Sequence, residues 1–252
     1  METGLSLWAR TSGTWINVLL VILGTSGGVL LRDRIPKSMQ SIITQAVGLI
    51  TIFIGLSMAQ PLADVSAGPV AGVIFGLLAL VFGGLLGEWA QIEQRLVVVG
   101  DALKKRFRGG GKFTEGFVAA SLLFCIGPMA ILGSLNNGLS GDGTILVIKG
   151  TMDGLISIAL TGSYGVGVGF SILPVLIYQG GLSLLSSVLA SGLADPATDP
   201  RVMLVTGVGG VMILGLGFNL LEVAKVRVAS FLPALVLAPV LYGLTVWVTG
   251  GR

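Results

Sequence analysis

The chain has 252 residues, of which 11% are charged and 53% hydrophobic, and 40 of the residues are glycine. An ordinary soluble domain carries roughly 25% charged residues, and so few charges cannot cover a water-facing surface. The composition therefore excludes a soluble globular domain, a disordered chain and a nucleic-acid-binding protein. His is absent and Cys125 is the single cysteine, so we expect neither a metal site nor a cofactor nor an intrachain disulfide.

Apolar stretches of the length that a membrane-spanning helix needs, about 20 residues, recur along the chain. They predict an all-α polytopic membrane protein with eight spans, at residues 14–31, 40–61, 68–88, 116–135, 145–162, 166–190, 202–221 and 229–249. The fifth span is short, and its junction with the sixth at residues 162–165 is tight. Six or seven spans, or a re-entrant segment at this junction, are therefore alternatives.

Basic residues concentrate in the odd-numbered loops, and they predict the orientation of the chain. Those of loops 1–2, 3–4 and 7–8 are Arg32, Arg34, Lys37, Lys104, Lys105, Arg106, Arg108, Lys112, Lys225 and Arg227. The even-numbered loops carry mainly acidic residues such as Asp64 and Asp142. By the positive-inside rule, loops 1–2, 3–4 and 7–8 are cytoplasmic.

A weak internal repeat relates the first three spans to the next three. Residues 28–50 resemble residues 133–155, and Gly72 aligns with Gly169. We interpret residues 13–90 and 114–190 as two repeats, followed by two additional helices at 201–250, within one integral membrane domain of residues 1–252. Three spans per repeat make the copies inverted, a plan that many secondary transporters share. The alternative is an old duplication that now builds only a scaffold.

Glycines four residues apart lie in several spans, as Gly24/Gly28, Gly72/Gly76, Gly83/Gly87 and Gly165/Gly169. Such pairs allow helix axes to approach closely in lipid. We expect them to pack within the chain, and a homo-oligomer formed through these glycine-rich faces is the alternative.

Two prolines interrupt predicted spans. Gly127-Pro128 falls in the fourth and Pro174 in the sixth, and each proline removes an intrahelical hydrogen bond. Together with the glycine- and amide-rich residues 133–138, the first proline predicts either a discontinuous helix that offers free carbonyls to a solute or a simple packed kink.

Lys149 and Asp153 are the most informative polar residues, because they lie four apart on one helix face and Asp153 falls near the middle of its span. Ionisable residues inside a membrane are functional candidates by default, although a structural ion pair is the alternative. The amides that could line the same polar path are Asn17, Asn136, Asn137 and Gln179. Glu88 and Asn219 are weaker candidates, as an interfacial anchor and an interhelical hydrogen-bonding group.

Enzyme chemistry finds no support in these residues. The chain has no His, no close pair of membrane carboxylates, no nucleophile motif around a serine and no phosphate-binding Gly-x-x-x-x-Gly-Lys-Ser/Thr sequence. We therefore expect a protein that is not an enzyme and does not hydrolyse ATP.

Several short motifs resemble those of a known family. They are Gly13-Thr14-Trp15-Ile16-Asn17 leading to Gly24, Gly28 and Pro36, then Gly87-Glu88, Leu123-Phe124-Cys125 with Gly133, Gly141-Asp142, Ile145–Lys149 with Asp153, and Leu232-Pro233-Ala234-Leu235. The chain resembles the YqgA/YdfK-like family of uncharacterised bacterial inner-membrane proteins, a domain-of-unknown-function family. The resemblance implies a multi-span helical fold in a bacterial plasma membrane. It implies no activity and no functional residues.

These observations favour gradient-driven transport of a small solute or ion, with Lys149 and Asp153 at the site. The partners that we expect are the lipid bilayer and this solute or ion. A non-transporting membrane scaffold or partner subunit, in which Lys149 and Asp153 form a structural bridge, is the alternative. A polar cavity that reaches Asp153 favours the transporter, and dry packing around it favours the scaffold.

Overall fold

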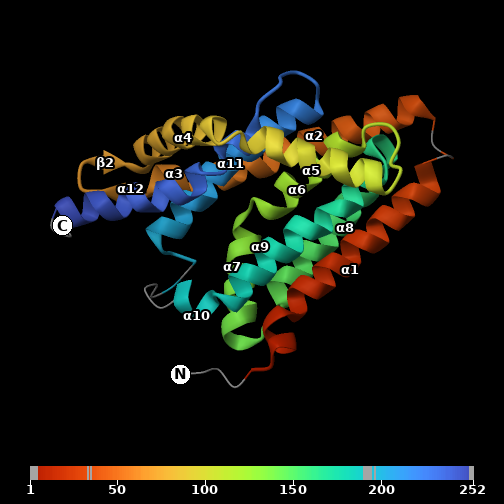
Figure 1. Cartoon of the computed structure of the whole chain (residues 1–252). Coiled ribbons are helices and arrows are strands. Elements are labelled where there is room, and N and C mark those ends of the chain that lie inside the picture. Colours follow the sequence, from red (N-terminus) through yellow and green to blue (C-terminus); the bar gives the residue numbers. More distant parts are fainter. Residues whose placement is uncertain (1–4, 33, 35, 190–194, 196, 250–252) are drawn as a thin grey trace. The chain divides into compact units, whose positions relative to one another are not determined.

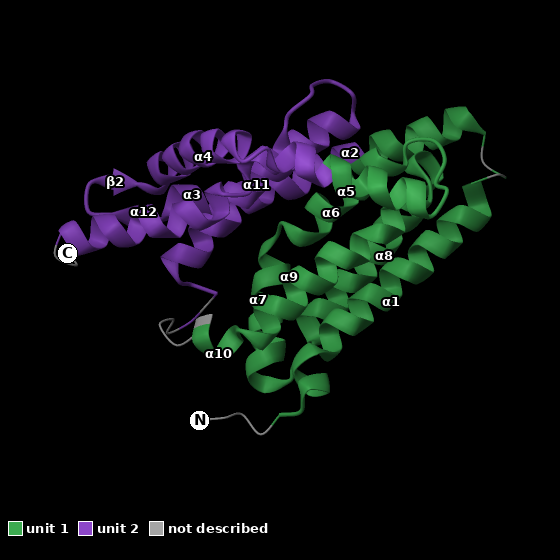
Figure 2. Ribbon diagram, in the orientation of Figure 1, with its two compact units in different colours: residues 1–47, 97–194 green, residues 48–96, 195–252 purple. Residues whose placement is uncertain are grey.

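The protein is an all-α polytopic membrane protein, and 83% of the computed structural model is helical. The structure describes residues 5–32, 34, 36–189, 195 and 197–249. The predicted ends at residues 190 and 250 lie outside the described residues. Figure 1 shows long helices connected by short loops, and the chain divides into two compact units, residues 1–47 with 97–194 and residues 48–96 with 195–252 (Figure 2).

Unit 1 is built around helices from the first half and the middle of the chain. Its elements are α1 (Leu7–Arg32), the first half of α2 (Lys37–Ala59), most of α5 (Ile92–Arg106), α6 (Phe113–Cys125), α7 (Pro128–Ser140), α8 (Thr144–Tyr164), the 3-10 helix η1 (Val166–Ser171), α9 (Ile172–Leu184) and α10 (Ser186–Leu189). Helices α1 and α8 run parallel, because Gly13 packs on Leu146 and Gly28 packs on Thr161.

Unit 2 contains the second half of α2 and the start of α5, together with α3 (Pro61–Asp64), β1 (Ser66–Ala67), β2 (Val70–Ala71), α4 (Gly72–Trp89), α11 (Pro200–Leu220), the 3-10 helix η3 (Val228–Phe231) and α12 (Ala234–Val248). The two strands form an antiparallel hairpin in which Ser66 pairs with Ala71. Gly68 turns the hairpin with a φ of 58°, a conformation that glycine adopts without strain. This hairpin was not predicted from the sequence.

The spans agree with those predicted. Within the described residues, seven helices are long and apolar enough to cross a membrane, and the bent pair of α6 and α7 makes an eighth when it is counted as one span. The tight junction after the fifth span separates two helices, because α8 ends at Tyr164 and the backbone reverses at Gly165, whose φ is 81°. The fifth and sixth spans are therefore separate helices and do not merge into one.

The fourth span is broken at Pro128, the position at which the sequence predicts a discontinuity or a kink. Helices α6 and α7 meet at an angle of 61°, and α7 starts at Pro128, which has no N–H to continue α6. Residues 133–138, which we considered as part of the discontinuity, are helical within α7. Pro174 breaks nothing, since it lies in the first turn of α9, where an α-helix leaves N–H groups without intrahelical acceptors.

Glycine contacts hold neighbouring helices together within each unit. A Cβ at Gly24 would lie 2.0 Å from the carbonyl oxygen of Gly154, and one at Gly87 would lie 1.9 Å from that of Ser230. Gly72 and Gly76 pack on Leu62. Segments of the same chain therefore occupy these glycine positions.

Candidate functional site

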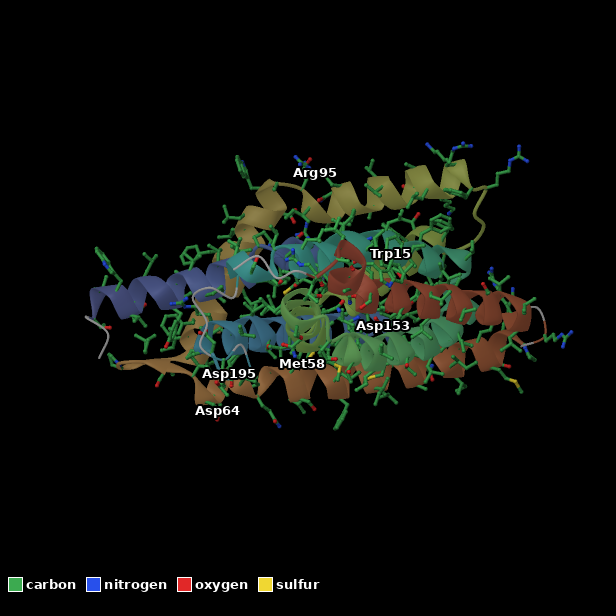
Figure 3. The ribbon with its side chains drawn as sticks, turned by 90° about the horizontal axis from the view of Figure 1, so that it is seen from below. Trp15, Met58, Asp64, Arg95, Asp153 and Asp195 are labelled. Atoms are coloured by element: carbon green, nitrogen blue, oxygen red, sulfur yellow. The ribbon has the colours of Figure 1, made fainter. Side chains whose placement is uncertain are left out.

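The candidate site lies at the centre of α8 in unit 1. Asp153 is the tenth of the 21 residues of this helix, about 14 Å from its start at 1.5 Å per residue. Lys149 lies one turn earlier on the same face, and the two residues are each only 6% exposed. Figure 3 shows the side chain of Asp153 among the helices, whereas Arg95 projects away from the chain. A charged pair thus lies half-way along a helix that is long enough to cross a membrane.

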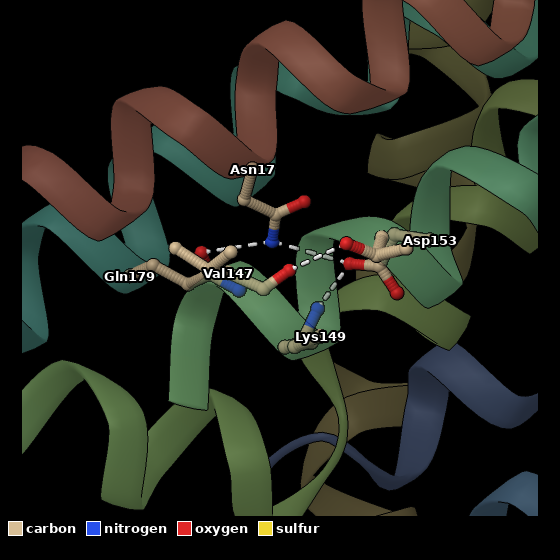
Figure 4. Close-up of polar contacts among 6 residues, drawn as sticks. Asn17, Val147, Lys149, Asp153 and Gln179 are labelled. Atoms are coloured by element: carbon tan, nitrogen blue, oxygen red, sulfur yellow. Dashed lines mark hydrogen bonds and ion pairs between the residues drawn. The ribbon is translucent and has the colours of Figure 1, made fainter. Parts of the chain in front are cut away.

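Asn17 connects this pair to a third helix (Figure 4). Lys149 Nζ forms an ion pair with Asp153 Oδ2. Asn17 Nδ2, on α1, donates to the same carboxylate oxygen at 3.2 Å and to Oε1 of Gln179, on α9, at 3.1 Å. We call Asn17, Lys149, Asp153 and Gln179 the central cluster. Asn17 and Gln179 are fully buried, so four of the predicted site residues converge in the interior of unit 1.

Glycines place Asn17 over Asp153. A Cβ at Gly150 would lie 2.8 Å from the Cα of Asn17, and one at Gly154 would lie 2.8 Å from the carbonyl oxygen of Leu20. Any larger residue at these two positions would push α1 and α8 apart. Gly150 and Gly154 therefore determine how closely Asn17 approaches the carboxylate of Asp153.

The break between α6 and α7 borders the cluster on the side of Lys149. The ammonium of Lys149 lies 6.0 Å from the centre of the Phe124 ring, close enough for a cation–π interaction. Phe124 is in the last turn of α6, and its carbonyl has lost its helical donor because Pro128 has no N–H. The carbonyl end of a helix carries partial negative charge, which stabilises a nearby ammonium.

Buried polar groups are concentrated in unit 1. Among the described residues, Thr51 and Ser230 are the buried polar side chains of unit 2, and all others belong to unit 1. Ten buried side-chain nitrogen or oxygen atoms find no hydrogen-bond partner among the described residues, and all ten are in unit 1. Buried polar atoms in proteins are nearly always bonded to protein or ordered water, so ordered water is the partner that these atoms require first.

The unpartnered atoms follow the helices that form the central cluster. On α1 they belong to Thr14, Asn17 and Thr25, and on α8 to Ser157 and Thr161. On α9 they belong to Gln179 and Ser183, and Ser134, Ser171 and Ser186 complete the set. Asn17 Oδ1 and Gln179 Nε2 leave the cluster itself with one free acceptor and one free donor.

A groove between α1 and α9 approaches the cluster from one end of these helices. It has a volume of about 610 Å³ and is lined mainly by apolar residues, from Leu7 and Leu184 at the helix ends to Thr14 and Gly180. Thr14 is one turn from Asn17, and Gly180 follows Gln179. The residues that line the groove include neither Lys149 nor Asp153.

The other predicted amides have different surroundings. Asn137 is fully buried, but its side chain connects α7 to the start of α1: Oδ1 accepts from the Gly13 N–H at 3.0 Å, and Nδ2 donates to the Ala9 carbonyl at 3.0 Å and to Ser12 Oγ at 3.2 Å. Asn136 is half-buried and contributes no hydrogen bond to the central cluster. Asn137 thus has a packing role in the structure, and Asn136 is not part of the cluster.

The weaker candidates belong to unit 2. Glu88 pairs with Arg227 at 2.5 Å and accepts from Ser230 Oγ at 3.4 Å. Asn219 closes the loop after α11 through two bonds of 2.7 Å to the backbone of Val226. Nearby, Glu93 accepts from the Ala229 N–H at 3.0 Å, and burial raises the pKa of its carboxyl group above the ordinary value. These contacts organise the loop between α11 and α12.

Sequence reasoning gave no weight to two buried hydroxyls on the same helix as Asp153. Ser157 and Thr161 continue the spacing of Lys149 and Asp153 at every fourth residue, and the two hydroxyl residues are fully buried. Serine and threonine are so common in membrane helices that they carry little weight individually. The four-residue spacing from Asp153 was the signal that could have identified them.

Comparisons with known proteins agree with this architecture. A family described as "Protein of unknown function (DUF554)" matches residues 12–243. The chain belongs to the DUF554 family. It is 31% identical to "Uncharacterized membrane protein YdfK" of Bacillus subtilis over 229 residues, which cover 90% of this chain and 94% of the relative. It is 30% identical to "Uncharacterized protein YqgA" of Escherichia coli over 243 residues, covering 93% and 98%. No solved structure matches the chain.

The DUF554 relatives agree with the resemblance expected from the sequence motifs. One of them is described as a membrane protein, in accord with the apolar helices of this chain. Among the described residues, no group of three or more Cys, Asp or Glu side chains is placed to hold a metal ion. The chemistry that the central cluster offers is therefore that of one carboxylate, one ammonium and two amides.

Proposed function

We propose that this DUF554 protein transports a small solute or ion across the bacterial inner membrane, driven by a gradient, with the central cluster as its binding site. The observation that supports it is the buried charged pair of the central cluster, in which Asn17 Oδ1 and Gln179 Nε2 are left without partners among the described residues. Intramembrane charges are costly and occur mainly along substrate and ion pathways. Unit 2, whose buried side chains are almost all apolar, would be the supporting part.

The proposed arrangement in the membrane follows from the loops. Loops 1–2, 3–4 and 7–8 would face the cytoplasm, because they carry most of the basic residues. Two inverted repeats, residues 13–90 and 114–190, would place the site at their interface. The antiparallel course of the first and fourth spans supports this: the start of α1 lies at the end of α7, where Gly13 meets Asn137.

A scaffold is the second candidate, because Lys149 and Asp153 neutralise each other and are each only 6% exposed, and the mainly apolar groove between α1 and α9 does not reach Asp153. In that case the pair would be a structural bridge, and a partner protein would bind elsewhere on the chain. The two candidates differ in whether charge at Asp153 matters for flux.

The test is ion flux through purified protein in liposomes, with dyes for H⁺, Na⁺ and K⁺ and imposed gradients of each. Asp153→Asn keeps the shape of the side chain and an acceptor for Asn17 but removes the charge. We expect it to reduce flux at least about tenfold, since one lost charge-assisted interaction is worth a factor of this order. Asp64→Asn, which changes an exposed carboxylate, is the matched control. Equal flux in wild type and Asp153→Asn, with equal folding, removes Asp153 from the mechanism and favours the scaffold.

A further inference from the structure

The hydroxyls of unit 1 differ in how they are satisfied. Several donate to the carbonyl one turn earlier, either on an exposed face, as in Ser26 to Ile22 at 2.8 Å and Thr151 to Val147 at 2.9 Å, or buried, as in Ser121 to Phe117 at 2.5 Å. Ser157 and Thr161, which are fully buried on the same helix as Thr151, make no such bond to any described residue. A buried water is the partner that would satisfy these two hydroxyls.

These hydroxyls form a continuous stripe along α8. Lys149, Asp153, Ser157 and Thr161 follow at intervals of four residues, about 6 Å apart along the axis, and together cover about 18 Å. All four side chains are buried. A stripe with this spacing places each polar group within reach of the next through one bridging water.

Neighbouring helices add polar groups beside the stripe and at one of its ends. Thr25 of α1 lies level with Ser157, because Gly24 packs on Gly154 and Gly28 on Thr161, and its hydroxyl lacks a partner among the described residues. Toward the start of α1, Asn17 is preceded by Thr14, which lines the groove between α1 and α9. The polar groups thus continue from the groove through the central cluster to the end of α8 next to η1.

The surroundings of Asp153 fit a proton better than a larger ligand. Its Oδ2 is approached by two donors, the Lys149 ammonium and Asn17 Nδ2, whereas a metal cation needs several oxygen ligands around it. The contact between Gly24 and Gly154 holds α1 and α8 too close for an organic solute to pass between them. A proton requires only the carboxylate oxygen and a neighbouring water.

We propose that a water-filled, hydroxyl-lined path through unit 1, formed by Thr14, Asn17, Asp153, Ser157, Thr161 and Thr25, conducts protons to and from Asp153. A proton that arrives from a water binds the carboxylate and releases the Lys149 ammonium from Oδ2. Its departure to the next water restores the ion pair, so no other reactant is consumed. The inference rests on the proposed function and names its ion.

The test measures proton uptake into liposomes that contain a trapped pH-sensitive dye, with a potassium gradient and valinomycin to set the membrane potential. Ser157→Ala and Thr161→Val remove a hydroxyl each while keeping the shape of the side chain. We expect each to slow proton flux about tenfold, because each removes a hydrogen-bonding position from the water path. The matched controls Ser26→Ala and Thr151→Val, in which the lost hydroxyl faces outward, should leave the flux unchanged.

Water access is measured separately. In a Cys125→Ser background, Ser157→Cys and Thr161→Cys should react with a small, water-soluble thiol reagent, and Leu160→Cys, which replaces a fully buried apolar neighbour, should not.

Proton flux that survives both stripe substitutions, or unreactive thiols at both positions, overturns the path even if Asp153→Asn abolishes transport. Sodium or potassium flux without proton flux overturns the proton path but supports the proposed transport function. Equal flux of every ion in wild type and Asp153→Asn contradicts the proposed function itself.

Discussion

Lys149 and Asp153 owe their arrangement to burial rather than to favourable helix pairing. The order of the two charges along α8 is the less favourable one for an exposed pair, and a charge in this interior is costly unless it is paired. Phe124 and the end of α6 lie against the ammonium, while Asn17 supports the carboxylate. The pair is therefore a unit, and removing one member affects the other.

This dependence predicts a non-additive response to substitution. Lys149→Met leaves Asp153 buried without its ammonium and should lower the free energy of unfolding by about 3–5 kcal/mol. Adding Asp153→Asn removes the unpaired charge, and Asn17 retains an oxygen to which it can donate. We expect the double variant to recover most of the lost stability in denaturant unfolding in detergent, with Lys105→Met as an exposed control. A double variant whose loss of stability equals the sum of the losses measured for Lys149→Met and Asp153→Asn alone would show that the two residues are not energetically coupled.

The sequence identifies which residues are unusual but not which of them meet. Lys149 and Asp153 stand out because they are charged within an apolar stretch. Asn17 and Asn137 look equivalent, since each is an amide in a span, yet one bonds to Asp153 and the other joins α7 to the backbone of α1. The difference arises from the packing of helices that are distant in sequence, and no local pattern carries that information.

At the scale of helices, close approach through glycine determines the geometry of the site. The contact between α1 and α8 has no space for a side chain at Gly24, where a Cβ would lie 2.0 Å from a backbone oxygen of α8. Backbone cannot yield as a flexible side chain can, so the two helices would have to separate. Asn17, two turns earlier on α1, would then lose its position over Asp153.

Two glycines on α1 provide a matched comparison of this effect. Gly24→Ala should destabilise the protein by about 1–3 kcal/mol, the usual cost of overfilling a packed interior. Gly27→Ala, whose Cβ would meet its nearest atom at 3.9 Å, should leave stability unchanged or raise it slightly, since alanine favours helix more than glycine does. Thermal unfolding in detergent measures the two variants. Equal effects at the two positions would contradict the close contact between α1 and α8.

Helix boundaries were predictable where they depend on local chemistry. Apolar length gives the spans, and the missing N–H of Pro128 gives the break in the fourth. The basic segment between the third and fourth spans was interpreted only as a loop, but residues Ile92–Arg106 form helix α5. This segment contains many residues that favour helix, such as Glu, Gln, Leu, Lys and Arg. It is too highly charged to resemble a membrane span, so apolar length alone does not identify it as a helix.

At the scale of the whole molecule, polar burial is strongly uneven. Unit 1 holds the charged pair and the unpartnered hydroxyls, whereas unit 2 packs through glycine contacts and apolar side chains such as Phe75, whose ring lies 5.8 Å from that of Tyr242. Each unit draws its helices from distant parts of the sequence. The predicted repeats follow the order of the chain and do not coincide with these units, because α1 and α4 belong to different ones.

The orientation of the chain in the membrane is the prediction that connects these scales, since it decides from which side protons or solutes reach Asp153. Single cysteines at Lys37, Lys105 and Ser66, all exposed positions, can be introduced in a Cys125→Ser background. The positive-inside rule predicts that Lys37→Cys and Lys105→Cys react with an impermeant maleimide only after the cells are permeabilised, and that Ser66→Cys, in the hairpin of the second loop, reacts in intact spheroplasts. Reaction of Lys37→Cys and Ser66→Cys from the same side would mean that α2 does not cross the membrane. Reversed sides would place the groove near Thr14 at the cytoplasmic end of α1 instead of the outer end.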